Sequence, residues 1–441
     1  MALSGLDIYR LLPKTNCREC GFVTCLAFAM QLAKKAVSID KCPYLSAEGK
    51  FTLEAQGQPP IKLVSIGVGE TKLDLGNETV LFRHEEKFHH PCGIGFILED
   101  GLSESEIKDR LSAINKLKFE RVGQKLEVNL VAIKQVSSQE KFIKAVAQVA
   151  GGTDLGLILM SGELEGLAQG LKVAKDRKPL IYYLGTNYAD VAKLAKEFNA
   201  PLVAAAQNLE TLSKLTQELN AYGVAELILD TGIKPIKDKI WDLTQIRRLA
   251  LKKSNRSLGY PTLAVVDKKG LYEEAMEAAS YISKYAGIIL LKNVDAGEIL
   301  SLLTLRQNIY TDPQKPLQIE PKLYPIGDAD KNSPVLITTN FSLTYYTVMG
   351  EVEASKIPAY ILSVDTEGMS VLTAWAAEKF TPEKISDSIN KFGAKDAVAH
   401  KKIIIPGYVA VISGDLEEAS GLQVIVGPKE AAGLPAFLKN L

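Results

Sequence analysis

From residue 92 onward, short apolar runs alternate with longer stretches whose apolar residues recur at the spacing of an amphipathic helix. Eight such runs are the expected strands: 92–100, 126–134, 155–161, 179–185, 201–206, 225–232, 262–268 and 287–293. Each is followed by a helical pattern, and a hairpin-like pair of strands is expected before them near residues 61–88, within 61–69 and 78–88. Eight strand–helix units predict a (β/α)8 barrel of the TIM type, and a long open doubly wound sheet is the alternative.

A second apolar pattern follows the proline-rich stretch 313–334. Four short, nearly all-apolar runs are typical of parallel strands covered on both faces: 335–340, 360–365, 402–407 and 422–427. Helices are expected at about 342–354, 367–391, 408–420 and 430–440. The pattern predicts a small doubly wound, Rossmann-like domain, whose ligand crevice lies outside the carboxyl ends of the strands.

Composition limits the classes of partner. The 441 residues carry 52 basic and 52 acidic side chains, which indicates no nucleic-acid partner. The amino terminus lacks the pattern of a signal peptide, and no apolar run has the length of a membrane span. We therefore expect a cytoplasmic α/β multidomain protein with no membrane partner. Its expected parts are a small module with a linker (1–58), the barrel with its N-terminal hairpin (59–312), and a linker with the terminal domain (313–441).

Four of the five cysteines lie near the start of the chain: Cys17, Cys20, Cys25 and Cys42. Structural zinc usually takes two close pairs of ligands, and here the second pair is missing. Three closely spaced thiolates with a distant fourth suit a 4Fe–4S cluster, so these cysteines are its predicted ligands; zinc and unligated thiols are the alternatives. Cys92 lies in a strand-like run, where a small buried apolar side chain is expected.

The cluster module is expected to be tethered, because YLSAEGKFTLEAQGQPPIKL after Cys42 is rich in Gly, Pro and polar residues. Farther along, polar residues end several of the barrel strands, where barrel active sites lie: Ser161, Thr186, Asn187, Gln207, Asn208, Asp230, Asp267 and Asn293. These residue types also cap helices, so caps or a ligand site remain open. No catalytic residue is assigned.

The strand ends of the terminal domain open into small, hydroxylic or Gly-rich loops, such as TTNFSLT and DTEGMSVLTAW. Such loops let the backbone approach a broad, flat ligand and offer amides and hydroxyls to its edges. Ordinary turn chemistry is the alternative. The absence of GxGxxG and GxxxxGK means that neither a dinucleotide nor a nucleoside triphosphate is indicated.

Five segments of the chain are distinctive together: NCRECGFVTC near the start, and TTNFSLTYYTV, SVDTEGMSVLTAW, IPGYVAVISGDLEEASG and VIVGP in the terminal domain. With them the whole chain resembles the large (gamma) subunit of the corrinoid iron–sulfur protein of the reductive acetyl-CoA (Wood–Ljungdahl) pathway. The resemblance implies a methyl carrier rather than a self-sufficient enzyme. A corrinoid cobalt takes a methyl group from methyltetrahydrofolate through a partner methyltransferase and delivers it to acetyl-CoA synthase, while the 4Fe–4S cluster reduces inactive Co(II) to Co(I).

The resemblance also implies a heterodimer with a small barrel subunit, and a low-potential electron donor or reductive activator as a further partner. It places the cluster on the four cysteines and the corrinoid on the strand-end loops. The implied corrinoid contacts are Thr338, Thr344, Gly368, Met369, Ser370, Val371, Thr373, Pro406, Gly407, Gly427, Ala431 and Ala432.

Many cobalamin domains carry DxHxxG, whose histidine coordinates cobalt, but the corresponding string here, Asp365 to Gly368, has no histidine. The cobalt is therefore expected to lack a histidine ligand, and the resemblance implies that the nucleotide base is displaced as well (a base-off corrinoid). Loss of an axial donor makes the cobalt easier to reduce. Two rival functions are a tetrahydrofolate-dependent methyltransferase with its own barrel site, and an electron-transfer or scaffold subunit.

Overall fold

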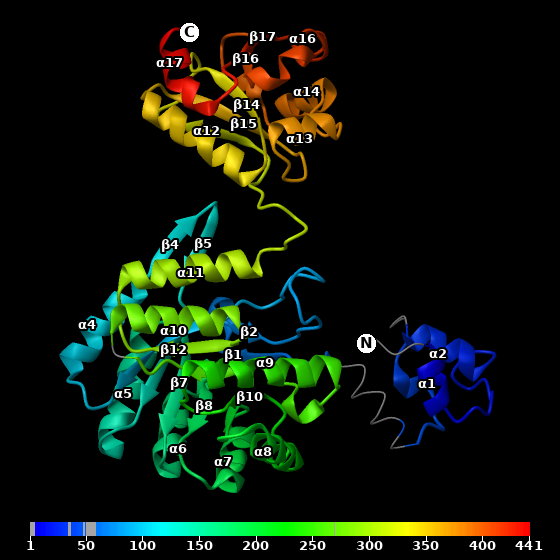
Figure 1. Cartoon of the computed structure of the whole chain (residues 1–441), viewed down its shortest axis with the longest axis vertical. Coiled ribbons are helices and arrows are strands. Elements are labelled where there is room, and N and C mark those ends of the chain that lie inside the picture. Colours follow the sequence, from blue (N-terminus) through cyan, green and yellow to red (C-terminus); the bar gives the residue numbers. More distant parts are fainter. Residues whose placement is uncertain (1–4, 34–36, 47–48, 50–58, 269) are drawn as a thin grey trace. The chain divides into compact units, whose positions relative to one another are not determined.

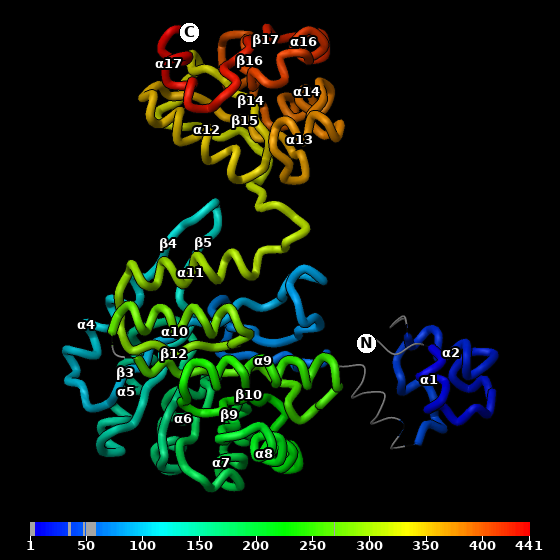
Figure 2. Tube along the Cα trace, viewed as in Figure 1, coloured from blue at the N-terminus to red at the C-terminus, as the bar shows by residue number. Residues whose placement is uncertain are grey.

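The structure is a computed structural model that describes residues 5–33, 37–46, 49, 59–268 and 270–441 (Figures 1 and 2). The chain divides into two compact units, 1–118 with 126–310 and 119–125 with 311–441. Most of the predicted tether falls on 47–48 and 50–58, and the end of the helix predicted from Cys25 falls on 34–36, all outside the described residues. None of the described helices is both long and apolar enough to cross a bilayer.

The N-terminal segment contains two short helices, α1 (Gly5–Leu11) and α2 (Cys25–Ala33). Ile8, Leu12 and Phe28 are buried together in its core, and Cys25 belongs to the same cluster. So small a core gives little stability by itself, and segments of about 40 residues usually need a metal or a disulfide in addition.

Eight parallel strands form the central sheet of the first unit, in the order β10-β9-β8-β7-β6-β3-β12-β11. They are β3 (Gly93–Glu99), β6 (Leu130–Lys134), β7 (Gly156–Ser161), β8 (Leu180–Tyr183), β9 (Leu202–Ala205), β10 (Leu227–Asp230), β11 (Leu263–Val265) and β12 (Ile288–Leu291). Each is followed by a helix: α4 (Glu104–Asn115), α5 (Gln139–Gly152), α6 (Leu164–Val173), α7 (Tyr188–Glu197), α8 (Leu209–Ala221), α9 (Ile236–Lys252), α10 (Leu271–Ser283) and α11 (Ala296–Tyr310). The isolated bridge Leu229↔Thr262 links β10 to the residue before β11, the two ends of this strand order. The eight-stranded sheet is therefore nearly closed, and the prediction of a barrel is confirmed.

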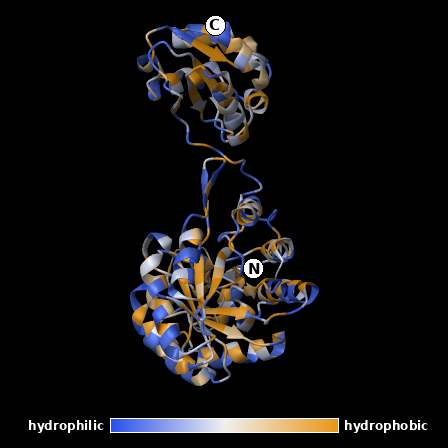
Figure 3. Ribbon diagram, turned by 90° about the vertical axis from the view of Figure 1, so that its left-hand side faces the viewer, coloured by the Kyte–Doolittle hydropathy of each residue, from blue (hydrophilic) through white to orange (hydrophobic). Residues whose placement is uncertain are grey.

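An antiparallel hairpin, β1 (Val64–Ile66) and β2 (Leu73–Leu75), closes the amino-terminal end of the barrel. Its Val64, Ile66 and Leu75 join the apolar cluster inside the barrel. The Gly67 N–H donates to the Lys178 carbonyl (3.0 Å), just before β8, which fixes the hairpin at this end. The orange strands in Figure 3 show how apolar this interior is.

The second strand of this hairpin was expected within residues 78–88, and that position is wrong, since the structure has no strand there. Carboxylates satisfy the backbone of this stretch instead: Glu78 accepts from the His89 N–H (2.9 Å), and Glu85 from the Leu81 N–H (3.1 Å). A further pair of strands, β4 (Lys118–Arg121) and β5 (Gln124–Glu127), was not expected, and β5 occupies the start of the predicted strand 126–134.

The second unit contains a five-stranded sheet in the order β13-β15-β14-β16-β17. Its strands are β13 (Leu323–Ile326), β14 (Val335–Thr339), β15 (Ala359–Val364), β16 (Lys402–Ile405) and β17 (Gln423–Val426). The last four are the predicted parallel strands. β13 is antiparallel and lies inside the predicted linker; its Pro325 is tolerated because β13 is an edge strand.

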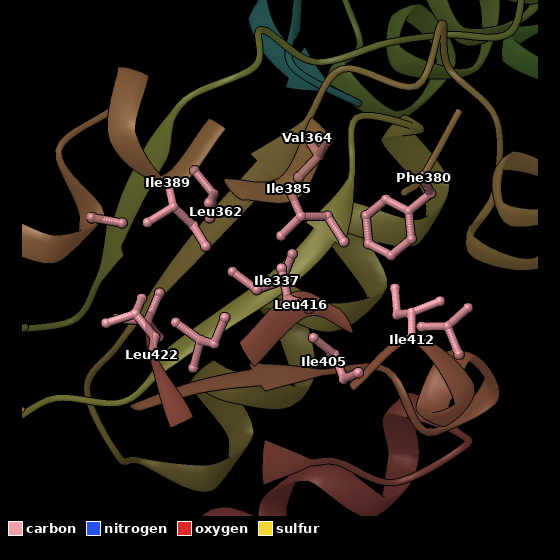
Figure 4. Packing of buried hydrophobic residues seen from close by; sticks show 14 of the residues in the cluster. Ile337, Leu362, Val364, Phe380, Ile385, Ile389, Ile405, Ile412, Leu416 and Leu422 are labelled. Atoms are coloured by element: carbon pink, nitrogen blue, oxygen red, sulfur yellow. The ribbon is translucent and has the colours of Figure 1, made fainter. Parts of the chain in front are cut away.

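Helices cover both faces of this sheet: α12 (Ser342–Ser355), α13 (Val371–Ala376), α14 (Pro382–Lys391), α15 (Ala394–Ala397), α16 (Ser413–Ser420) and α17 (Leu434–Lys439). On one face Ile337 and Leu362 pack against Phe380 and Ile385 (Figure 4). On the other face Leu336 packs with residues of α12 and α17. The helix expected at 367–391 is two helices, because Thr381 caps a new start at Pro382.

Candidate functional site

The four N-terminal cysteines lie around the start of α2. Cys17 is exposed, Cys20 and Cys42 are half-buried, and Cys25 is buried as the first residue of the helix. The Cys25 N–H donates to Asn16 Oδ1 (2.8 Å), so the loop that carries Cys17 also caps the helix.

The backbone of this loop is held in an uncommon conformation. Lys14, Asn16 and Arg18 have φ values of 60°, 50° and 66°, in the left-handed region that residues other than glycine rarely adopt. Such conformations concentrate at ligand sites, where the surrounding structure maintains them.

The surroundings of Cys42 shift its pKa. Burial raises the pKa of Cys42, an N–H of Tyr44 opposes that shift, and the charges of Cys20, Cys25 and Cys17 raise the pKa further. Within the described ranges, no three Cys, His, Asp or Glu side chains are drawn together as a bound ion would need. The fit to an iron–sulfur cluster therefore rests on the donor set, which consists of four sulfurs. Cys92 does not belong to this donor set. It is fully buried, and burial raises its pKa to about 12.

A pocket of about 410 Å³ opens at the carboxyl ends of the strands of the second unit. Seven of the predicted corrinoid contacts line it: Thr338, Thr344, Ser370, Val371, Pro406, Gly427 and Ala431. The pocket lies where the strand pattern placed the ligand crevice.

Five predicted contacts do not line this pocket: Gly368, Met369, Thr373, Gly407 and Ala432. Met369 packs against the core of the unit. A Cβ on Gly407 would lie 2.6 Å from the Gly427 carbonyl oxygen, so this glycine allows two backbones to approach. Their role as contacts stays a prediction.

Several lining residues were missed, among them Phe341, Leu343, Thr347, Val348, Leu372, Tyr408 and Lys429. Thr347 and Val348 follow Thr344 at helical spacing, and this signal could have found them. Tyr408 lies in a short 3-10 helix (Gly407–Ile412) and Lys429 on a loop, where no long periodic pattern indicates the direction of a side chain.

The pocket is chemically suited to a broad, largely apolar ligand with polar edges. Its walls are mainly aliphatic and aromatic, and Thr338 is only 1% exposed. In the described part of the chain, Thr338 Oγ1 has no hydrogen-bond partner, so a ligand edge could satisfy it. These features fit a corrinoid ring.

No histidine of the second unit reaches this pocket. His400 Nε2 lies 2.9 Å from the Ser333 carbonyl and Nδ1 accepts from the Lys402 N–H, at the amino ends of β14 and β16. That edge is opposite the pocket. Glu367, in the string that lacks a histidine, pairs with Lys379 (2.6 Å).

The polar side chains at the carboxyl ends of the barrel strands bond to other residues of the protein wherever their side-chain bonds are described. Asn208 caps α8, and Ser161 Oγ accepts from the Glu163 N–H (2.9 Å). Asp230 is buried, paired with Lys239 (2.5 Å), and accepts from the Tyr182 hydroxyl, whose pKa burial and this carboxylate raise. These contacts favour the structural interpretation over a ligand site.

Comparisons with known proteins cover the whole chain. The family model "CO dehydrogenase/acetyl-CoA synthase delta subunit" matches residues 63–438, and the model "Putative Fe-S cluster" matches 12–44, the span of all four cysteines. The "Corrinoid/iron-sulfur protein large subunit" of Moorella thermoacetica is 47% identical over 100% of this chain and 99% of its own. The "Acetyl-CoA decarbonylase/synthase complex subunit gamma" of Methanothermobacter thermautotrophicus is 37% identical over 100% and 99%. A solved dihydropteroate synthase from Vibrio fischeri is 16% identical, covers 56% of this chain and 97% of its own, and has a TM-score of 0.42.

Proposed function

The chain belongs to the family of corrinoid/iron–sulfur protein large subunits, and we propose that it is a methyl carrier that works between partner enzymes. The single observation that supports this most is the apolar pocket whose Thr338 hydroxyl has no hydrogen-bond partner among the residues that the structure describes, in a chain that also carries a four-thiol module. The proposed partners are a small barrel subunit, a methyltetrahydrofolate methyltransferase, acetyl-CoA synthase and a low-potential electron donor or activator. The cytoplasm is the expected compartment.

In this proposal a bound corrinoid supplies a cobalt that accepts and releases the methyl group, and a 4Fe–4S cluster supplies the electron that restores an oxidised cobalt. The terminal unit is proposed to be a doubly wound corrinoid-binding domain. Thr338 donates from the floor of its pocket, and Thr344 and Ser370 offer hydroxyls at its sides. The aliphatic walls exclude water from the ring.

Cys17, Cys20, Cys25 and Cys42 are the proposed cluster ligands. The proposed corrinoid has no histidine ligand from the protein, because His400 lies at the opposite edge of the sheet and Glu367 is paired with Lys379. That its nucleotide base is also displaced (base-off) is proposed from the resemblance to the family. Without an imidazole donor the metal accepts an electron more readily, which suits repair by a low-potential cluster.

An anaerobic absorption spectrum of the purified chain tests both cofactors at once. We expect a base-off corrinoid band above a broad iron–sulfur absorption. A terminal unit that stays colourless after anaerobic incubation with a corrinoid would contradict the methyl carrier. Methylation of free cobalamin from methyltetrahydrofolate without a partner would favour a methyltransferase instead.

A further inference from the structure

Asn340 lies immediately after β14 and is only 1% exposed. Its side-chain oxygen accepts three hydrogen bonds from the loop that follows β15. The donors are the Thr366 N–H (2.9 Å), the Thr366 hydroxyl (3.0 Å) and the Gly368 N–H (3.0 Å). One buried carboxamide thus holds the neighbouring strand-end loop at three points.

The amide nitrogen of Asn340 has its own two partners. It donates to Gln318 Oε1 (3.2 Å) and to Asp365 Oδ1 (3.3 Å). An aspartate of the same shape could replace the accepting oxygen but not these donors. A carboxylate at position 340 would also face the Asp365 carboxylate.

The loop after β15, to which the Asn340 side chain is bonded, contains an uncommon backbone conformation. Glu367 and Gly368 are consecutive residues with φ values of 58° and 75°. A left-handed non-glycine residue is costly and persists only where its surroundings determine it. The same loop leads directly to Ser370, Val371 and Leu372, which line the pocket.

Asn340 also joins this loop to the segment by which the chain enters the unit. The Ile319 N–H donates to the Asn340 carbonyl (3.0 Å), and the Ser342 N–H donates to the Leu317 carbonyl (2.9 Å). Gln318 then lies beneath the loop, since a Cβ on Gly368 would be 2.6 Å from Gln318 Cγ. The carboxamide therefore connects the incoming segment, the end of β14 and one wall of the pocket.

We propose that Asn340 is a positioning residue, which sets loop 365–370 against the corrinoid and thereby determines how tightly the corrinoid is held. It does not line the pocket itself and acts through Ser370 and Val371. The inference rests on the proposed function, since it takes the corrinoid as the ligand of this pocket.

The test is titration of the full chain with cobinamide, a corrinoid without a nucleotide base, followed by absorption. The Asn340→Asp variant keeps an oxygen that can accept the bonds from Thr366 and Gly368 but loses the N–H groups that donate to Gln318 and Asp365. It should weaken the binding of cobinamide about tenfold or more. Asn390→Asp, an exposed position on α14, is the matched control and should bind as the parent does.

A rescue experiment distinguishes a positioning role of Asn340 from a general effect on the stability of the protein. In the double variant Asn340→Asp with Asp365→Asn, the new amide at position 365 can donate to the new carboxylate at position 340, and Gln318 can turn its amide to donate as well. We expect binding to recover to within a few-fold of the parent. If Asn340→Asp does not fold, the exposed Gln318→Ala variant takes its place, with a smaller loss in the same direction.

Unchanged binding in the folded Asn340→Asp or Gln318→Ala variant would overturn the inference. So would a loss that the folded double variant fails to restore. If the parent itself takes up no cobinamide, the proposed function fails and the inference fails with it; if the parent binds and Asn340→Asp binds equally, only the inference fails.

Discussion

At the residue scale, the five cysteines divide by environment into two kinds. Cys17, Cys20, Cys25 and Cys42 share one small segment; burial raises the pKa of Cys42, and the charges of the other three raise it further. Cys92 is fully buried in the barrel unit, and burial raises its pKa to about 12. A thiol that resists deprotonation so strongly is a poor metal ligand, because metals bind the thiolate.

Replacement of Cys20 by alanine should therefore abolish the EPR signal of the reduced cluster. Methyl transfer by protein whose corrinoid has been reduced beforehand should stay nearly intact, since the cluster serves only repair. Cys92→Ala is the control and should keep the signal. If Cys20→Ala lost methyl transfer as well as the EPR signal, the role of the cluster would be to stabilise the structure.

A second prediction concerns the pocket wall. Thr344 lies on α12 and lines the pocket, so Thr344→Trp should fill space that the corrinoid needs and lower corrinoid content after reconstitution several-fold. Ala354→Trp, on the exposed side of the same helix, should leave the content unchanged. Full occupancy in Thr344→Trp, measured by cobalt analysis, would remove Thr344 from the site.

At the element scale, the ends of β16 and β17 approach so closely that only glycine fits between them. A Cβ on Gly407 would lie 2.6 Å from the Gly427 carbonyl oxygen and 2.8 Å from the Lys429 nitrogen, both backbone atoms that cannot turn away. The contact therefore fixes the backbone of Gly427 and Lys429, which line the pocket, although Gly407 itself does not line it.

We expect Gly407→Ala to lower the free energy of unfolding of the second unit by about 1–3 kcal/mol. Gly414→Ala in α16 is the matched control, because no atom of the described residues that are compared lies within 4 Å of its added Cβ. That change should be neutral or stabilise by up to about 1 kcal/mol. Denaturant titration of both variants measures the difference, and equal stabilities would contradict the close approach.

The start of α11 contains a buried carboxyl group that should make stability depend on pH. Both oxygens of Glu298 lack hydrogen-bond partners among the described residues. Burial, followed by the charges of Glu274 and Asp295, raises the pKa of Glu298 from 4.5 to about 7. The folded state therefore binds this proton more tightly than the unfolded state, and stability should fall as pH rises from about 4.5 to 7.

Glu298→Gln should remove this part of the pH dependence and stabilise the barrel unit above pH 7. Glu104→Gln, at an exposed position in the first turn of α4, should leave the pH profile as it is. Urea titrations across this pH range measure the free energy of unfolding of each variant. If the stability of Glu298→Gln depends on pH as that of the parent protein does, the assignment of this dependence to Glu298 is wrong.

At the scale of the whole molecule, the chain is two compact units with separate cores. The proposed corrinoid binds one of them only. Corrinoid at about 100 times its dissociation constant should stabilise that unit by about 2.7 kcal/mol, by mass action. Calorimetry should show one unfolding transition moving upward while the barrel transition stays in place. A common shift of both transitions would indicate that the units unfold together.

The hydrophobic pattern alone determined the eight barrel strands and the four parallel strands of the second unit. Strands buried on both faces are continuous apolar runs, which a sequence displays directly. The grouping of four cysteines was equally visible, because their spacing is local. Family membership followed from motifs that occupy contiguous segments, and the comparisons confirm it.

Only the tertiary structure decided features that depend on distant partners. The hairpin strand β2 was misplaced because the bonds of Glu78 and Glu85 to backbone N–H groups leave no periodic signal. β13 was missed because a proline-rich edge strand resembles a linker. Asn340 was the last residue of the predicted strand 335–340 and was assigned no role. Its role depends on Gln318, Asp365 and Thr366, which only the fold brings to its side chain. Sequence thus determined which elements form, while packing decided which side chains meet, because periodicity reports burial and not contact.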